Sequence, residues 1–293
     1  MTPQAIVGLA LKVSIMLTVF GFGLQATRDD LLYVVRRPGL MARSLVAMFV
    51  IMPIVAIMLT SVFHFQLPVV IALIALAISP VPPLLPRKIG KAGGVAPYGL
   101  GLMVTAATIS ILYIPLAAYL IGTYFNKPFD MAPGAVAKLI LMSVLLPIAA
   151  GMALQNVAPA LAERIAKPVG LFAKIFLLVG FLAVIVFALP KSFVLIGNGT
   201  LVALIVFIVI GLLVGHFLGG PGPEEQITLS LSTACRHPAL AIALAAANVP
   251  EEHNVFSAIL LYLVLNAIIT SAYMFWRRRK IKAAEKTHTQ LAV

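Results

Sequence analysis

The stretch Ser232-Thr233-Ala234-Cys235-Arg236-His237-Pro238-Ala239 lies within a run of membrane length, residues 226–249, that contains no other charged side chain. A guanidinium near the bilayer midplane costs roughly 2.5–3.5 kcal/mol on insertion scales, so an arginine at this depth indicates a functional site. Pro238 removes a backbone donor and weakens the helix beside it. A charge and a helix break in one span together indicate a site for an ion or a substrate.

The composition around this stretch is that of a polytopic membrane protein. The chain has 293 residues, of which 62% are hydrophobic and 10% are charged, and its mean hydropathy is +1.10. The net charge of +12 comes from basic residues in short loops and at the C-terminus. This is the positive-inside pattern, so the lipid bilayer is the expected partner and nucleic acid is not. The single cysteine, Cys235, excludes an internal disulfide.

Nine segments of the chain are apolar and long enough to span a bilayer, which predicts an all-α fold with nine transmembrane helices. They are residues 6–24, 42–63, 67–85, 97–124, 134–154, 168–189, 200–219, 226–249 and 254–276. The first segment has no basic stretch before it and is expected to be retained rather than cleaved as a signal. Residues 156–167 interleave apolar and charged side chains, which favours a position along the inner interface, with a plain linker as the alternative.

The positions of Lys and Arg orient these helices. With the N-terminus outside, the inner loops and the tail hold Arg28, Arg36, Arg37, Arg43, Arg87, Lys88, Lys91, Arg164, Lys167 and the run 277–280. The outer loops hold only Lys127 and Lys191. The prediction is therefore N-out and C-in, and the compact size without a targeting signal favours a bacterial inner membrane.

A second predicted span, residues 67–85, runs into the sequence Ser79-Pro80-Val81-Pro82-Pro83-Leu84-Leu85-Pro86. Each of the four prolines, Pro80, Pro82, Pro83 and Pro86, removes a donor and restricts the residue before it, so no regular helix can form. The carbonyls that lose their donors must face protein or a water-filled cavity at this depth. We therefore expect a second interrupted helix here.

In the predicted topology the two interrupted spans run in opposite directions. This arrangement is typical of transporters built from inverted repeats, in which two discontinuous helices cross at the substrate site. The repeats would be residues 1–133 (spans 1–4, without a first helix) and 134–276 (spans 5–9), followed by a basic cytoplasmic tail, 277–293. The alternative is a simple proline kink in each span.

Arg236 has no evident carboxylate partner, because none of the nine acidic residues lies in the middle of a predicted span. The planar guanidinium matches a carboxylate or sulfonate with two hydrogen bonds, which favours a small organic anion as substrate. The alternative is a structural arginine that binds the carbonyls freed by the prolines of span three.

Other polar residues near the two breaks are candidates for the substrate-binding surface. His237 would carry a proton near neutral pH, or is merely a satisfied polar side chain. The remaining members of the proposed substrate-binding set are Ser79, Thr105, Thr108, Ser232 and Thr233. A serine or threonine in a membrane helix more often bonds its own i−4 carbonyl. Lys12 and Lys174 are expected to extend toward span ends, with a role in a cavity as the alternative.

No other chemistry is indicated. The sequence has no metal-ligand cluster, no glycine-rich phosphate loop and no paired acids suited to acid–base catalysis, so neither an enzyme nor a cofactor is expected. Substrate identity, direction of transport and oligomeric state are not indicated by the residues.

The motifs together resemble those of the bile acid:sodium symporter family over most of the chain. Residues 20–24 with Asp29-Asp30 are similar to the family's glycine-leucine stretch and following aspartate, and residues 48–53 to its Gln-Phe-x-x-Met-Pro. The two broken segments occupy the places of its crossover motifs, and residues 146–151 and 159–167 those of its second-repeat helices. The resemblance implies two inverted repeats, a panel and a core domain, and alternating access around crossed helices.

The departures from the family pattern concern its sodium ligands. By the resemblance, the crossover glutamate is replaced by Ser232, the glutamine by Arg236, the following asparagine by His237, and the glutamine of Gln-Phe by Met48. In span four, Thr105 keeps a family threonine while Gly101 replaces a serine. The resemblance thus implies a secondary transporter with altered or absent sodium coupling, in which Arg236 holds the anion or substitutes for a cation.

Three alternatives stay open from the sequence. One is a carrier of the same architecture but another class, such as an auxin-efflux-like or a metalloid carrier, the latter suggested by Cys235. Another is a sodium-coupled symporter despite the substitutions, with sodium or a proton as the coupling ion. The last is a channel or a membrane receptor that transports nothing.

Overall fold

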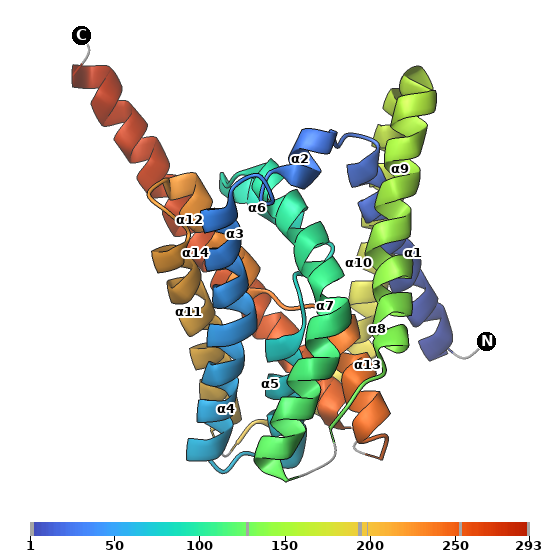
Figure 1. Cartoon of the computed structure of the whole chain (residues 1–293), viewed down its shortest axis with the longest axis vertical. Coiled ribbons are helices and arrows are strands. Elements are labelled where there is room, and N and C mark those ends of the chain that lie inside the picture. The colour runs from blue at the N-terminus through green and yellow to red at the C-terminus, as the bar shows by residue number, and fades with distance from the viewer. Residues whose placement is uncertain (1–2, 127–128, 193–194, 198, 252–253, 292–293) are drawn as a thin grey trace.

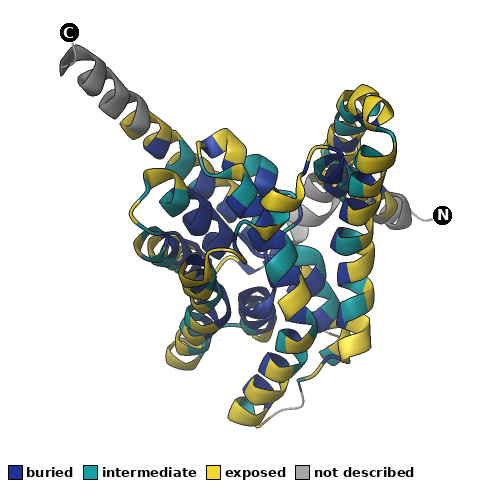
Figure 2. Cartoon of the chain, turned by 45° about the horizontal axis from the view of Figure 1, so that its top comes forward, coloured by how far each residue is buried: buried dark blue, intermediate teal, exposed yellow. Residues whose placement is uncertain are grey.

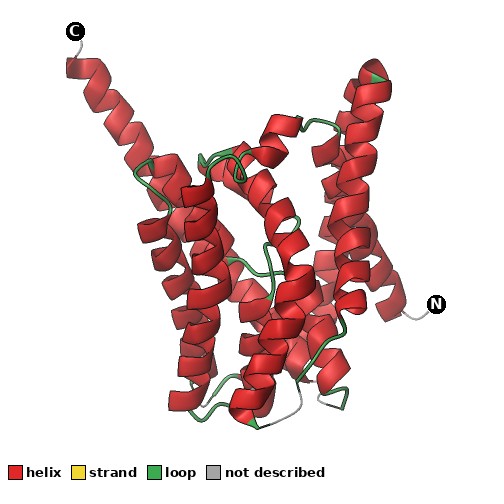
Figure 3. Ribbon diagram, in the orientation of Figure 1, coloured by secondary structure: helices red, strands yellow, loops and turns green. Residues whose placement is uncertain are grey.

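The computed structural model describes residues 3–126, 129–192, 195–197, 199–251 and 254–291, and for 3–8, 184–185, 187–192 and 281–291 only the backbone. This part of the chain is helical and contains no strand (Figure 3). The elements are α1 (Pro3–Gly23), α2 (Arg28–Leu32), α3 (Pro38–Val46), η1 (Ala47–Ile51), α4 (Met52–Val62), α5 (Leu67–Ile78), α6 (Leu85–Ala92), α7 (Ala96–Phe125), α8 (Pro133–Ile140), η2 (Leu141–Leu145), α9 (Leu146–Val157), α10 (Pro159–Ser192), α11 (Thr200–Leu218), α12 (Pro223–Ala234), α13 (Pro238–Asn248) and α14 (Asn254–Leu291).

Seven segments of the described chain are long and apolar enough to cross a membrane, by length and composition. They are Pro38–Val62, Ala96–Phe125, Pro133–Val157, Pro159–Ala183, Thr200–Leu218, Pro223–Asn248 and Asn254–Lys280. Two shorter apolar helices, Leu9–Gly23 and Leu67–Ile78, accompany them. The chain is therefore an all-helical integral membrane protein.

The helices form two groups (Figure 1). We call α1, α8, η2, α9 and α10 the panel, because α1 packs against α9 and α10. We call α3 to α7 and α11 to α14 the core bundle, in which α5 packs against α4, α13 and α14, and α11 against α12. The two groups touch through α7 with α8 and η2 and through α10 with α14.

Burial differs sharply between individual helices (Figure 2). In the most apolar window of each segment, 78% of the residues are buried in Pro223–Asn248 but only 11% in Pro159–Ala183. The interrupted helix pair α12–α13 is therefore enclosed by protein on most sides. The panel helix α10 presents mostly apolar side chains outward, as expected for a surface that faces lipid.

The structure contains two π-helical turns, and each ends two residues before a proline. The turn η1 ends before Met52-Pro53, and η2 ends before Leu146-Pro147. Proline cannot donate to the helix, so the chain accommodates it with a wider turn and continues. In η1 the Met52 N–H bonds the carbonyl of Ala47, five residues earlier. The Met48 carbonyl would pair next with Pro53, which has no N–H, and is left free.

Glycines allow the panel helices to cross at backbone contact. A Cβ placed on Gly23 of α1 would clash with the Ile148 carbonyl oxygen, and one on Gly151 of α9 with the Phe20 carbonyl oxygen. The two glycines face each other, with Gly23 Cα 2.8 Å from such a Cβ on Gly151. The motif at residues 20–24 is thus explained by helix packing.

Residues 156–167 belong to two consecutive helices rather than to a plain linker, and their position along the inner interface stays a prediction. The helix α9 continues to Val157, and α10 begins at Pro159 after the single residue Ala158. Proline is well tolerated at a helix start, where its missing N–H has no partner to lose. The charged residues therefore lie on the first turns of a long helix. The predicted tail from residue 277 likewise continues α14, which is helical to Leu291.

The contact at Gly151 leads to a stability prediction. Replacing Gly151 with alanine forces α1 and α9 apart, and we expect a loss of about 1–3 kcal/mol, as for other overpacked interiors. The measurement is thermal unfolding of the detergent-solubilised protein. Gly134→Ala is the control, because a Cβ there meets nothing within 4 Å. Equal unfolding temperatures for the two variants would show that the helices do not touch there.

Candidate functional site

The two interrupted segments meet at their breaks. Residues 79–84 separate α5 from α6, and residues 235–237 separate α12 from α13. The His237 N–H donates to the Pro80 carbonyl at 3.0 Å. Pro80, Pro82 and Pro83 lie in the first break, whereas Pro86 and Pro238 lie in the first turn of the helices that follow. Both breaks are therefore local and are joined to each other.

The Arg236 side chain lies at this junction and is 1% exposed. Its guanidinium donates from Nη1 to the Ser79 carbonyl at 3.2 Å and from Nη2 to the Met48 carbonyl at 3.1 Å. Its buried Nε has no partner among the described residues. The side chain thus connects the second break to the first break and to η1.

Both acceptor carbonyls are available because of proline. In a helix the Ser79 carbonyl would receive the N–H of residue 83, which is Pro83, and the Met48 carbonyl is left free by Pro53. A buried carbonyl without a donor costs free energy, and so does a buried cation without acceptors. Arg236 satisfies both needs at once. In this conformation Arg236 therefore has the structural role given above as the alternative to substrate binding: it binds carbonyls that proline has freed.

The second break is held by two residues of α14 that the sequence analysis did not select. The Tyr262 hydroxyl accepts from the Arg236 N–H at 2.9 Å and donates to the Ala234 carbonyl at 2.7 Å. Asn266 donates from Nδ2 to the same carbonyl at 2.8 Å. The signal was present in the sequence, because Tyr262, Asn266 and Thr270 recur every four residues and share one face of a helix.

Lys88 also lies against this face, although the topology assigned it to an inner loop. Its ammonium donates to the Thr270 hydroxyl and lies 3.9 Å from the Cys235 sulfur. The Cys235 thiol is buried and donates to Asn266 Oδ1 at 3.2 Å. Two cations, Lys88 and Arg236, therefore lie beside the second break, and no ion pair of the described residues involves either of them.

The other predicted site residues of the crossover segments are engaged in local bonds. His237 is 3% exposed, and its Nδ1 caps α13 by accepting from the Leu240 N–H at 3.4 Å. Ser232 and Thr233 bond the carbonyls four residues earlier, both at 2.8 Å, and Ser79 Oγ bonds the Leu76 carbonyl at 2.8 Å. In this conformation these side chains support helix ends and turns.

Among the described residues, no hydrogen bond joins the predicted residues of α7 to the junction. Thr108 is exposed and bonds the Val104 carbonyl at 2.9 Å, and Thr105 is half-buried. A Cβ on Gly101 would lie 2.9 Å from the Asp30 carbonyl oxygen. A serine there would displace α2, which explains why glycine occupies the position.

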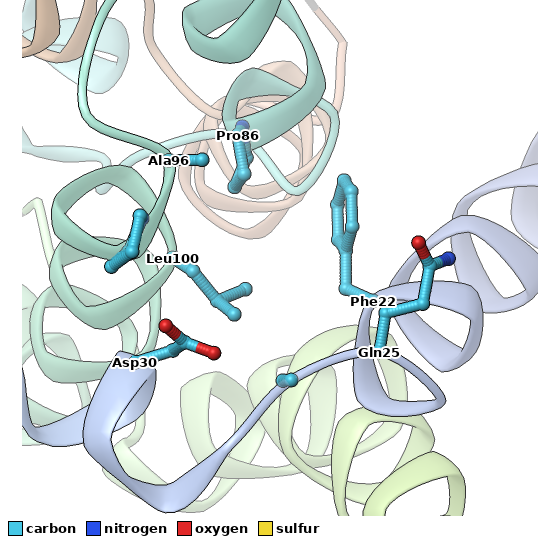
Figure 4. Close-up of a pocket in the computed structure, with 8 residues that line it drawn as sticks. Phe22, Gln25, Asp30, Pro86, Ala96 and Leu100 are labelled. Atoms are coloured by element: carbon cyan, nitrogen blue, oxygen red, sulfur yellow. The ribbon is translucent and has the colours of Figure 1, made fainter.

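A large cavity lies between the panel and the core bundle, not at Arg236. Its volume is about 930 Å³. The core bundle contributes Arg87 and Lys91 of α6; the panel contributes Gln155 of α9 and Glu163, Lys167 and Lys174 of α10, with Gln25 just after α1. A smaller cavity of about 300 Å³ shares Gln25 and is otherwise mostly apolar, lined by Phe22, Ala26, Asp30, Pro86, Ala96, Pro97 and Leu100 (Figure 4). We call the two cavities together the crevice.

The crevice was not predicted, because its lining comes from segments far apart in the chain, namely α1 and the residues after it, α2, α6, α7, α9 and α10. Lys174, for which a cavity role was the alternative to extending toward a span end, lines the wall. Arg236, His237, Ser232, Thr233, Thr105, Thr108 and Ser79 line neither cavity. Among the described residues no cluster of three or more His, Cys, Asp or Glu could hold a metal ion.

The hydrogen bonds of Tyr262 lead to a prediction. Tyr262→Phe leaves the Arg236 N–H without an acceptor in a buried setting, and we expect a loss of about 1–3 kcal/mol. Thermal unfolding in detergent measures it, with Tyr124→Phe as control because that side chain is 60% exposed. If both variants unfold like the parent protein, Tyr262 does not hold the break.

Comparison with known proteins agrees with this architecture. Residues 12–197, more than half of the chain, match the family model described as the Sodium Bile acid symporter family. A curated relative from Bacillus subtilis (strain 168), described as "Uncharacterized sodium-dependent transporter YocS", is 30% identical over 139 residues, which are 46% of this chain and 41% of the relative. The match thus spans less than half of that relative's length. The chain belongs to the sodium bile acid symporter family, a family of transporters rather than enzymes.

Proposed function

We propose that this protein is a secondary active transporter that carries a small organic anion by alternating access between the panel and the core bundle. The observation that carries the proposal is the crevice between these groups, lined by Arg87, Lys91, Lys167 and Lys174. Cationic side chains that face a water-accessible cavity attract anions and bind their oxygen atoms. We infer the transport activity from family membership, and the class of substrate from the positive charge of the crevice.

We further propose nine membrane crossings in two inverted repeats, residues 1–133 and 134–276. Seven segments qualify by length. The 21 residues of α1 are long enough for an eighth. The helix α5, with 12 residues, is too short alone and would cross together with α6. The interrupted pairs α5–α6 and α12–α13 would be the crossed discontinuous helices of the two repeats.

The orientation follows from the basic residues. Arg87, Lys91 and Lys167 lie on the side that is rich in Lys and Arg, which is the cytoplasmic side by the positive-inside rule. With the N-terminus outside and the C-terminus inside, the crevice would open to the cytoplasm of a bacterial inner membrane. The described conformation would then be inward-facing.

We propose that transport does not require sodium. Backbone carbonyls at a helix break are the ligands that discontinuous transporter helices offer to sodium, and here the Ser79 and Met48 carbonyls are bonded to the Arg236 guanidinium. A sodium ion at the same carbonyls would lie beside a permanent positive charge in a poorly solvated place, which opposes its binding. Arg236 would therefore substitute for a cation rather than touch the substrate.

Sodium coupling is the second candidate, because the name of the Bacillus relative describes a sodium-dependent transporter. Sodium would then bind elsewhere, or displace the guanidinium. The metalloid alternative has less support, because the Cys235 thiol is 5% exposed and bonded to Asn266.

Sodium dependence is the test. We expect purified protein in proteoliposomes to take up members of a radiolabelled panel (a bile acid, carboxylates and sulfonates) equally well with sodium and with N-methylglucamine. Sodium should also leave thermal stability unchanged, whereas a bound ion at a hundred times its Kd would stabilise by about 2.7 kcal/mol. Stabilisation of that size together with sodium-driven uptake would refute the proposal.

The variant Arg236→Gln is a second test of whether the guanidinium takes the place of sodium at the junction. Removing the guanidinium frees two buried carbonyls, so we expect the variant to be less stable and to become stabilised by sodium. A variant with unchanged stability would show that the guanidinium does not make the bonds assigned to it. The sodium experiment on the unmodified protein stands even if this variant does not fold.

A further inference from the structure

The basic side chains of the crevice lie on both of its walls. Arg87 and Lys91 are four residues apart on α6 and belong to the core bundle. Lys167 and Lys174 are seven residues apart on α10 and belong to the panel. Residues at these spacings share one face of a helix. Each wall therefore presents a pair of cations to the cavity.

The lining offers these cations little compensation. Glu163 is the one carboxylate that lines the larger cavity, and Gln25 and Gln155 are neutral. Asp30 lines the smaller cavity, where its side chain already accepts from the Thr27 N–H and hydroxyl. The larger cavity thus holds four cations and a single anion among its described lining residues.

The two walls approach each other at Arg87. Its guanidinium lies 5.9 Å from the centre of the Phe22 ring of the panel. Gly170 of α10 also lies near it, since a Cβ there would be in ordinary contact with Arg87, 3.8 Å from its Nη2. A core side chain thus reaches across the crevice to the panel, and any closing motion brings it nearer to Lys167 and Lys174.

Closure of such a crevice is opposed by its own charge. Like charges repel more strongly as they approach and as water leaves the space between them, because the effective dielectric constant falls. An anion with one negative group neutralises one wall at most. An anion with two separated groups neutralises both walls and attracts them toward each other.

We propose that the transported substrate is an organic anion with at least two negatively charged groups, such as a dicarboxylate or an organic phosphate ester. One group binds Arg87 and Lys91, the other binds Lys167 and Lys174, and an apolar part lies against Phe22, Pro86 and Leu100. The substrate's second charge is the condition for closure, which makes the crevice selective for polyanions. This inference rests on the proposed transport function and adds the substrate class to it.

Paired anions with one carbon skeleton test the proposal. We compare octanedioate with octanoate and butanedioate with butyrate, both as stabilisers of the purified protein and as radiolabelled substrates in proteoliposomes. We expect the dianion of a pair to bind at least about tenfold more tightly than the monoanion, which corresponds to about 1.4 kcal/mol for the second group. Uptake of monoanions with no preference for dianions overturns this inference and leaves the proposed function standing. Absence of uptake of every anion counts against both.

Charge-neutralising variants locate the second group. The double variant Lys167→Gln, Lys174→Gln should lose most of the dianion preference while its monoanion affinity changes little. Both side chains are exposed on α10, so folding should not suffer. Lys138→Gln is the matched control, because Lys138 is an exposed panel residue outside the crevice. A double variant that keeps the full preference would overturn the assignment.

An anionic lipid headgroup carries the same phosphate chemistry and must be distinguished from a free anion. The binding series is therefore run in vesicles of phosphatidylcholine alone and with added phosphatidylglycerol. Dianion preference in phosphatidylcholine alone supports the proposal. If the lysine variants change only the response to phosphatidylglycerol, the crevice holds a headgroup, and the proposal is wrong.

Discussion

The bonds from the Arg236 guanidinium to the carbonyls of Ser79 and Met48 are the constraint on which the rest of the core bundle depends. A buried cation without acceptors and buried carbonyls without donors are each unfavourable in an apolar interior, and the pairing removes both costs. The His237 N–H adds a bond to Pro80, and Tyr262 and Asn266 hold the Ala234 carbonyl. Two chain breaks in an enclosed bundle are thereby made compatible with a single packed structure.

In this arrangement the junction of the breaks and the crevice are two separate positively charged places in the molecule. The junction of the breaks contains fixed positive charge, Arg236 and Lys88, and is closed by protein. The crevice contains four further cations, Arg87, Lys91, Lys167 and Lys174, and lies between helix groups that touch through α7 with α8 and η2 and through α10 with α14. If the built-in cations do the work of coupling ions, as we propose, the anion gradient itself drives movement of the panel, and exchange of one anion for another becomes the natural mode.

Local features were predictable from the sequence, and contacts between distant segments were not. Prolines at 80, 82, 83 and 238 predicted where two helices stop, because proline acts on its own helix. The acceptor Met48 is 188 positions from Arg236, and its carbonyl is free only because η1 widens before Pro53. Lys88 was predicted to lie in a loop. Its contact with Thr270 could not be predicted, because the two residues are 182 positions apart in the chain. The crevice combines α1, α2, α6, α7, α9 and α10, and no local pattern brings them together.

An experimental structure determined in sodium-containing buffer tests the central claim most directly, because it shows what occupies the carbonyls at the junction. We expect the Arg236 guanidinium on the Ser79 and Met48 carbonyls, with no ion between the breaks. A metal ion coordinated by those carbonyls, with the guanidinium turned elsewhere, would contradict it.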